Sequence, residues 1–317
     1  MKLRYVILLL CALSFASLFI GVSSLSLFDL GQMTEEQKQI FWSSRFPRLV
    51  AIVMAGAGMA IAGLVMQQLT QNKFVSPTTA GTMDAARLGI LVSMIGFAGA
   101  SSLVRISVAV SFAVAGTFIF MFILERVKVK DKIFIPLVGL MFGNILGSIT
   151  TFFAYRYDLI QNMSAWLQGN FATVISGQYE LLWLVIPIVA FTYLYADRIT
   201  VAGMGESFAK NVGLSYRTVV NLGLVLTAVM TSLIVLTVGM IPFLGLIVPN
   251  IVSIFRGDHM RKNLPYTALF GAVFVLICDL FGRTIIYPYE IPIGLTVGVI
   301  GSGLFLYLLL RRHRYGL

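Results

Sequence analysis

The chain has 317 residues, of which 58% are hydrophobic and 11% are charged, and its formal net charge is +10 at pH 7. A mean hydropathy of +0.92 excludes a soluble globular protein of this size and indicates a membrane protein with several spans. In such a protein the distribution of basic residues reports the orientation of the spans, so the net charge does not indicate binding to nucleic acid.

Ten apolar runs are predicted to form transmembrane helices. They cover residues 3–22, 49–69, 79–97, 104–124, 134–155, 179–196, 218–240, 243–255, 264–286 and 293–310. The first run follows a basic N-terminus, as in a signal peptide, but its length favours a retained span. The eighth is short and comes after its neighbour with only Ile241 and Pro242 between them, which predicts a broken or re-entrant segment. We therefore predict an all-α polytopic membrane protein in which residues 1–317 form one transmembrane domain.

The basic residues predict that both termini are cytoplasmic. With ten spans, 16 of the 23 basic residues then fall on the cytoplasmic side, as the positive-inside rule requires. This topology also places the polar segment 199–218 in the cytoplasm. Within it, residues 206–211 are predicted to form a short helix, Gly213 to end that helix in a left-handed turn, and Ser215 to cap a second helix. We expect two short helices folded back on each other, forming a knob that a cytoplasmic partner can push.

Two pairs of opposite charges lie inside predicted spans, where charge is costly. Asp84 and Arg87 are three residues apart, and Asp279 and Arg283 are four apart. Each pair can therefore meet on one face of a helix. We interpret both as ion pairs that fix helix orientation. A proton or ion relay is the alternative, although a coupled-ion transporter favours an unpaired carboxylate near the midplane.

Arginines also lie at the predicted outer face, where positive-inside sorting disfavours them. Arg45 and Arg48 precede the second span on either side of Phe46 and Pro47, and Arg283 lies near the outer end of the ninth. Guanidinium groups facing outward suit an acidic protein surface or an anionic ligand.

Catalysis and cofactor binding find little support in the sequence. The two histidines lie in predicted loops, the two cysteines lie far apart in apolar runs, and there is no glycine-rich nucleotide loop of the Walker type. We expect no catalytic residue, no metal site and no cofactor in this chain. If ATP drives transport, then another polypeptide binds ATP and magnesium.

Several motifs resemble those of one transporter family. Residues 238–250, VGMIPFLGLIVPN, are similar to the G-x-I-x-F-x-G-L-x-x-P-H signature of FecCD-type permeases. Residues 256–259 resemble the R-x-x-G-x-D-H segment in shortened form, 279–283 the D-x-x-x-R step, and 290–294 the E-x-P-x-G before the last span. The RFPR sequence at 45–48 extends the resemblance upstream, so it covers nearly the whole chain.

The resemblance implies the fold, the partners and the sites. FecCD-type, or BtuC-like, permeases are the membrane subunits of type II ABC importers for ferric siderophores, haem and vitamin B12. The family implies about ten helices per subunit, a dimer of permeases (identical or paralogous), two cytoplasmic ATPase subunits and an extracytoplasmic binding protein. By resemblance, Arg45, Arg48 and Arg283 match arginines that dock the binding protein. The coupling helices, at about 203–216, match the family's G-x-x-x-A-x-x-L-G loop. Their predicted ATPase-contacting residues are Gly205, Glu206, Ser207, Phe208, Ala209, Lys210, Asn211, Val212, Gly213 and Leu214.

A narrower resemblance concerns the substrate. Residues 72–84, NKFVSPTTAGTMD, depart from the common family pattern and look like the subgroup that serves catecholate siderophores such as petrobactin in Gram-positive bacteria. The sequence therefore predicts a multi-pass permease of the cytoplasmic membrane, surrounded by lipid, that imports a ferric siderophore. The alternatives are a haem or vitamin B12 permease, an ion-coupled secondary transporter, and a receptor that binds a partner without transport.

Overall fold

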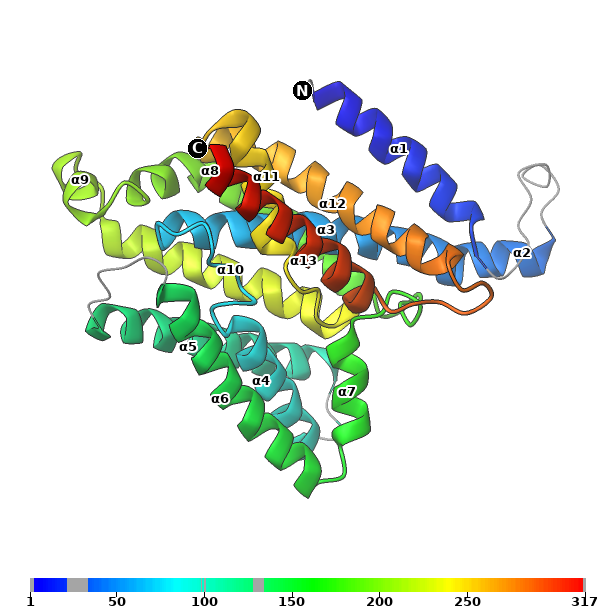
Figure 1. The fold of residues 1–317 in the computed structure, drawn as a ribbon. Coiled ribbons are helices and arrows are strands. Elements are labelled where there is room, and N and C mark those ends of the chain that lie inside the picture. The colour runs from blue at the N-terminus through cyan, green and yellow to red at the C-terminus, as the bar shows by residue number, and fades with distance from the viewer. Residues whose placement is uncertain (1–2, 22–33, 98, 100, 128–133, 316–317) are drawn as a thin grey trace.

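The computed structural model describes residues 3–21, 34–97, 99, 101–127 and 134–315, which form helices and no β-strand (Figure 1). The longer helices are α1 (Leu3–Phe19), α3 (Phe46–Leu69), α4 (Thr82–Gly96), α5 (Ser102–Val127), α6 (Phe134–Arg156), α8 (Val185–Ala202), α10 (Tyr216–Val238), α11 (Leu244–Arg256), α12 (Met260–Thr284) and α13 (Ile293–Tyr315). The short ones are α2 (Glu35–Ile40), the π-helix η2 (Phe41–Arg45), α7 (Ile160–Gln168), the 3₁₀-helix η3 (Glu180–Leu184) and α9 (Glu206–Asn211).

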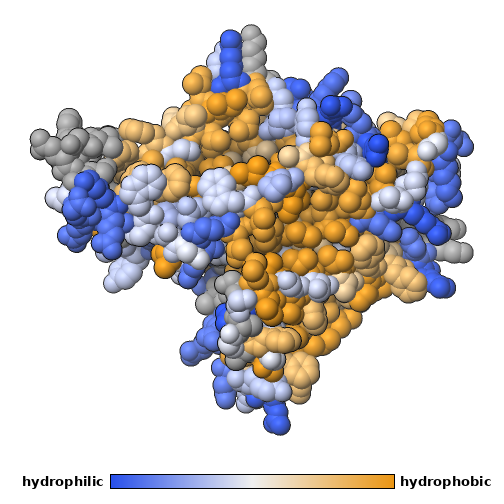
Figure 2. Space-filling view, turned by 180° about the vertical axis from the view of Figure 1, so that it is seen from behind, coloured by the Kyte–Doolittle hydropathy of each residue, from blue (hydrophilic) through white to orange (hydrophobic). Residues whose placement is uncertain are grey.

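Each of the ten predicted runs coincides with one long helix, which confirms the all-α membrane fold; Val22, the end of the first run, lies outside the described residues. Among the described residues, six stretches are long and apolar enough to cross a bilayer: 35–69, 103–126, 134–156, 180–202, 216–238 and 260–284. Shorter apolar helices occur at 3–19, 244–256 and 293–307. Figure 2 shows the expected outer surface, with a broad apolar area across the middle and hydrophilic residues gathered toward the margins.

Helix α3 is the centre of the bundle and packs against α8, α10, α11 and α12. Small residues on α3 allow this close approach. A Cβ atom on Gly56 would lie 2.7 Å from the carbonyl oxygen of Gly271 on α12. A Cβ atom on Gly63 would overlap the carbonyl oxygen of Gly245 on α11. The backbones of three helices therefore meet at two glycine pairs.

Helix α11 agrees with the predicted broken segment. Gly239 ends α10 with φ +90°, and Phe243 precedes α11 with φ +61°. The 13 residues of α11 span only about 20 Å at 1.5 Å per residue, less than the hydrocarbon core of a bilayer. Its first residues are buried against α3, so they are shielded by protein. This is the setting in which an interrupted helix is tolerated within a membrane.

The two ends of α3 carry different structures. Its N-terminal end continues from α2 and η2, whereas its C-terminal end lies next to the segment that leads into α9 (Figure 1). The 24 residues of α3 separate these two ends by about 36 Å. One rigid, buried helix thus connects two polar surfaces on opposite sides of the apolar band.

Replacing Gly63 by alanine tests the close packing. The added methyl group meets the backbone of Gly245, which cannot move as a side chain can, so we expect a loss of about 1–3 kcal/mol of stability. Thermal unfolding of the purified protein measures this loss. Gly147→Ala on α6 is the matched control, because a Cβ there has no neighbour within 4 Å. Equal melting temperatures for the two variants would contradict the packing described here.

Candidate functional site

Helix α9 and its flanking turns, residues 203–215, form a knob at one end of the molecule (Figure 1), which we call the α9 knob. Gly213, with φ +78°, terminates α9 as predicted. The amide of Leu214 donates to the carbonyl of Ala209 at 2.9 Å, and that of Gly213 donates to Lys210 at 3.0 Å. This is the Schellman pattern of helix termination, which requires a left-handed residue at the glycine position. The sequence signal at Gly213 therefore had a local physical cause.

The knob contains one short helix instead of the two predicted. After Gly213 the chain enters α10 directly at Tyr216. Ser215 occupies the N-cap position of α10, but its hydroxyl is hydrogen-bonded to that of Thr218 at 2.8 Å and caps no backbone amide. The predicted second helix is thus the first turn of α10. Helix α10 begins at Tyr216, so only Leu214 and Ser215 separate it from Gly213.

The surface of the α9 knob combines charge with exposed apolar side chains. Met204, Phe208 and Val212 are exposed, and Glu206 pairs with Lys210 at 2.8 Å. The hydrogen bond and positive charge of Lys210 hold the pKa of the Glu206 carboxyl below its usual range, so Glu206 is ionised at neutral pH. Exposed apolar residues at a polar end of a membrane protein are typical of a contact with another protein.

The base of the α9 knob lies against the end of α3. A Cβ atom on Gly203 would lie 2.8 Å from the carbonyl oxygen of Gln68. A polar cavity of about 550 Å³ opens beside this contact, with Gln67 and Asn263 in its wall. The base of the α9 knob is therefore in direct contact with α3.

The opposite end of α3 holds a series of alternating charges, Arg283–Asp279–Arg48–Glu290, which we call the charge chain. Arg48 on α3 donates to Asp279 at 2.8 Å and to Glu290 at 2.7 Å. Asp279 also pairs with Arg283 one turn along α12, as the spacing predicted. Sequence reasoning missed Glu290 as a member and missed the partners of Arg48, which are 231 and 242 residues away.

Two arginines at this end also bind the C-terminal turn of α1. Arg283 donates to the carbonyl oxygens of Ser17 and Ile20, each at 3.0 Å, and Arg45 donates to that of Leu18 at 3.0 Å. Carbonyl groups in the last turn of a helix lack helical partners, and cationic donors satisfy them well. In this conformation the three arginines predicted to dock a partner are therefore engaged within the chain, and Arg45 and Arg283 are buried.

The ion pair expected between Asp84 and Arg87 requires correction. Within the part of the chain that the structure describes, no salt bridge joins these two side chains, although their charges still attract. Asp84 lies in the first turn of α4, where the helix dipole favours an acid. Its carboxylate faces α6, since a Cβ on Gly143 would lie 2.6 Å from it. Packing against α6 has determined the orientation of Asp84.

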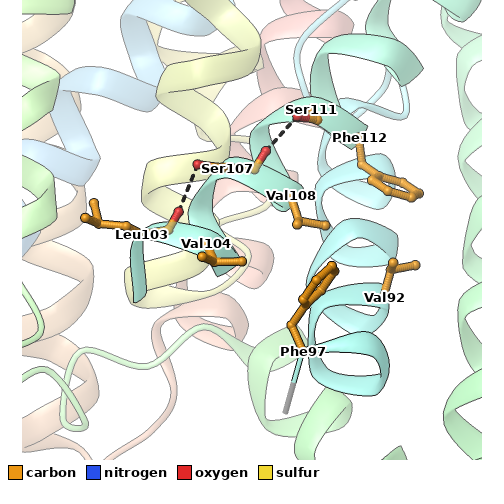
Figure 3. Close-up of a pocket in the computed structure, with 8 residues that line it drawn as sticks. All are labelled: Val92, Phe97, Leu103, Val104, Ser107, Val108, Ser111 and Phe112. Carbon is orange, nitrogen blue, oxygen red and sulfur yellow. Dashed lines mark hydrogen bonds between the residues drawn. The ribbon is translucent and has the colours of Figure 1, made fainter. Parts of the chain in front are cut away.

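A second hollow, of about 470 Å³, is an apolar groove between α4 and α5 (Figure 3). Phe97, Val104 and Phe112 are among its lining residues. The hydroxyls of Ser107 and Ser111 donate to carbonyl oxygens one turn earlier on their own helix, at 2.9 and 2.7 Å. The hydroxyls of both serines are thus engaged within α5, and the other described lining residues are apolar.

Known proteins resemble this chain over nearly its whole length. The model of the FecCD transport family matches residues 7–311. The chain is 61% identical to the petrobactin import system permease protein YclN of Bacillus subtilis strain 168, over 99% of this chain and 100% of that protein. It is 41% identical to the ferric-anguibactin transport system permease protein FatD of Vibrio anguillarum, over 95% of each. The solved structure of a metal-chelate type ABC transporter in an inward-facing conformation shares the fold, with a TM-score of 0.83 at 24% identity over 98% of both chains.

Replacing Asp279 by asparagine tests the charge chain. When Asp279 is neutral, Glu290 is the one carboxylate of the charge chain that remains for its two arginines. An uncompensated buried charge costs about 3–5 kcal/mol of stability. We expect a large fall in the midpoint of thermal unfolding. Glu35→Gln is the control, because Glu35 pairs with Lys38 at the exposed surface of the same end. A melting temperature for Asp279→Asn equal to that of the control would refute the structural role of the charge chain.

Proposed function

The chain belongs to the FecCD transport family, and from that premise we propose that it is the membrane-spanning permease subunit of an ATP-binding cassette importer for a ferric siderophore. The observation that carries this proposal is its identity of 61%, end to end, with a petrobactin import permease. A catecholate siderophore similar to petrobactin is the substrate we propose. A ferric-anguibactin permease and a second petrobactin permease, from Bacillus anthracis, are 41% and 39% identical, so the 61% match alone carries the choice of petrobactin.

The α9 knob is the proposed contact with the ATPase subunits. Its exposed apolar side chains, Met204, Phe208 and Val212, suit a groove on a partner protein. Its Schellman termination makes it a rigid element, and its base abuts α3. These features support transmission of movement from a nucleotide-driven partner into the bundle. In this proposal the α9 end, and with it both termini, lies in the cytoplasm, in agreement with the distribution of basic residues.

The end that carries Arg48 is the proposed docking surface for an extracytoplasmic binding protein. Exposed aromatic residues, Trp42, Tyr287 and Tyr289, occur in the segments that carry the charge chain. Of the two arginines in the charge chain, Arg48 is the more exposed to solvent. Arg45 and Arg283 support this surface from within by holding α1 in place.

The proposed transport cycle is alternating access in a complex of two permease subunits, two ATPases and one binding protein. Docking at the Arg48 end delivers the siderophore, and ATP hydrolysis in the partners moves the α9 knobs. The two permeases then rock around a path between them. No covalent bond is formed or broken by this chain.

Uptake in proteoliposomes tests the proposal. Ferric petrobactin is supplied with the binding protein outside and ATP inside, with and without the ATPase subunits. We expect uptake only when ATP, the ATPases and the binding protein are all present. Uptake by this chain alone, driven by a proton or sodium gradient, would instead establish an ion-coupled transporter.

Gly213→Val, measured in the same proteoliposomes, tests the coupling role of the α9 knob. The branched side chain strains the left-handed turn, so we expect uptake to fall at least about tenfold while ATP hydrolysis persists. Gly177→Val is the matched control at the other end. Gly177 also has a positive φ, +91°, and an added Cβ meets nothing within 4 Å at either glycine. Normal uptake by Gly213→Val would show that the turn at Gly213 is not needed to couple ATP hydrolysis to uptake.

A further inference from the structure

The charge chain becomes more exposed toward Glu290. The side chains of Asp279 and Arg283 are each 3% exposed, that of Arg48 is 12% exposed and that of Glu290 is 24% exposed. Asp279 is held by two arginines, whereas Glu290 contacts the charge chain through Arg48 alone. A partner approaching this end therefore meets the most weakly held carboxylate first.

Glu290 lies outside the helices. It belongs to residues 285–292, which connect the end of α12 to the start of α13. Beside it, the amide of Ile291 donates to the carbonyl of Gly282 at 3.0 Å, and Tyr289 donates to Ile286 at 2.8 Å. Neither bond involves the Glu290 side chain. Its ion pair with Arg48 therefore ties this segment to α3.

The surroundings of Glu290 have the composition of a protein interface. Tyr287 and Tyr289, which precede it along the chain, are exposed, as are Ile285 and Ile286. Aromatic residues and arginine are enriched where proteins bind each other. The acidic group at this position covers the guanidinium of Arg48, which is the natural partner for a carboxylate of a docking protein.

We propose that an acidic side chain of the docked binding protein replaces Glu290 on Arg48. This inference rests on the function proposed above and adds a mechanism to its docking step. Because one carboxylate replaces another, Arg48 has two carboxylate partners both before docking and after it, and no buried charge is left unpaired in either state. The released Glu290 no longer ties residues 285–292 to α3 through Arg48, whereas the bond from Ile291 to Gly282 still holds this segment to α12.

The affinity of the binding protein for Glu290→Gln tests this exchange. In the wild type, docking must first separate Glu290 from Arg48. Neutral glutamine competes less strongly for the guanidinium, so we expect the dissociation constant to fall about fivefold, the weight of a partly exposed ion pair. The measurement uses the complete permease–ATPase complex in nanodiscs, titrated with the purified binding protein of the same import system.

Glu35→Gln is the matched control, because it removes the same charge from the same end of the molecule. Glu35 is 89% exposed and pairs with Lys38, outside the charge chain. Unchanged or weaker docking by Glu290→Gln, or equal tightening by Glu35→Gln, overturns the exchange. If Glu290→Gln is recovered poorly, Glu290→Asp is measured in its place. The shorter aspartate side chain reaches Arg48 less well, so the dissociation constant of the binding protein is again expected to fall. A wild-type complex that transports but does not bind the protein contradicts the docking surface itself.

Discussion

The charge chain is the constraint on which one half of this membrane protein depends. Charged side chains are costly in hydrocarbon, and a buried ion is tolerated only where every charge has a partner. Here two arginines and two carboxylates alternate, so each charge lies next to an opposite one. One terminal nitrogen of Arg283 also donates to carbonyl groups at the end of α1. The charge chain thereby fixes α1, α3, α12 and the approach to α13 with one set of contacts.

The middle and the C-terminal half of α3 depend on close contact between backbones. The glycine pairs that join α3 to α11 and α12 leave no room for side chains to adjust, so α3 behaves as a stiff element between its two ends. At one end it carries Arg48, and at the other it abuts the base of the α9 knob. The same buried helix therefore connects the two surfaces, which suits the coupled movement proposed for this chain.

The features that sequence reasoning identified are those with local causes. Apolar runs gave the helices, the spacing of Asp279 and Arg283 gave their pair, and Gly213 was recognised because helix termination needs a left-handed residue. The partners of Arg48 could not be found in this way, since they come from segments more than 200 residues away. Asp84 shows the converse: helical spacing permitted an ion pair, but tertiary packing against α6 oriented its carboxylate differently. Spacing along a helix determines which side chains can meet, and tertiary packing determines which of them do.

Site-specific crosslinking tests most directly the claim that the two ends of α3 face different partners. Cys11, which is exposed, is first replaced by serine; Cys278 is buried and remains. A cysteine is then introduced at Lys210 on the α9 knob and, separately, at Glu35 on α2, which precedes the N-terminal end of α3. Both introduced positions are exposed. In the assembled complex, Lys210→Cys is expected to crosslink to the ATPase and Glu35→Cys to the binding protein. Crosslinking of the ATPase through Glu35→Cys, and not through Lys210→Cys, would contradict the account.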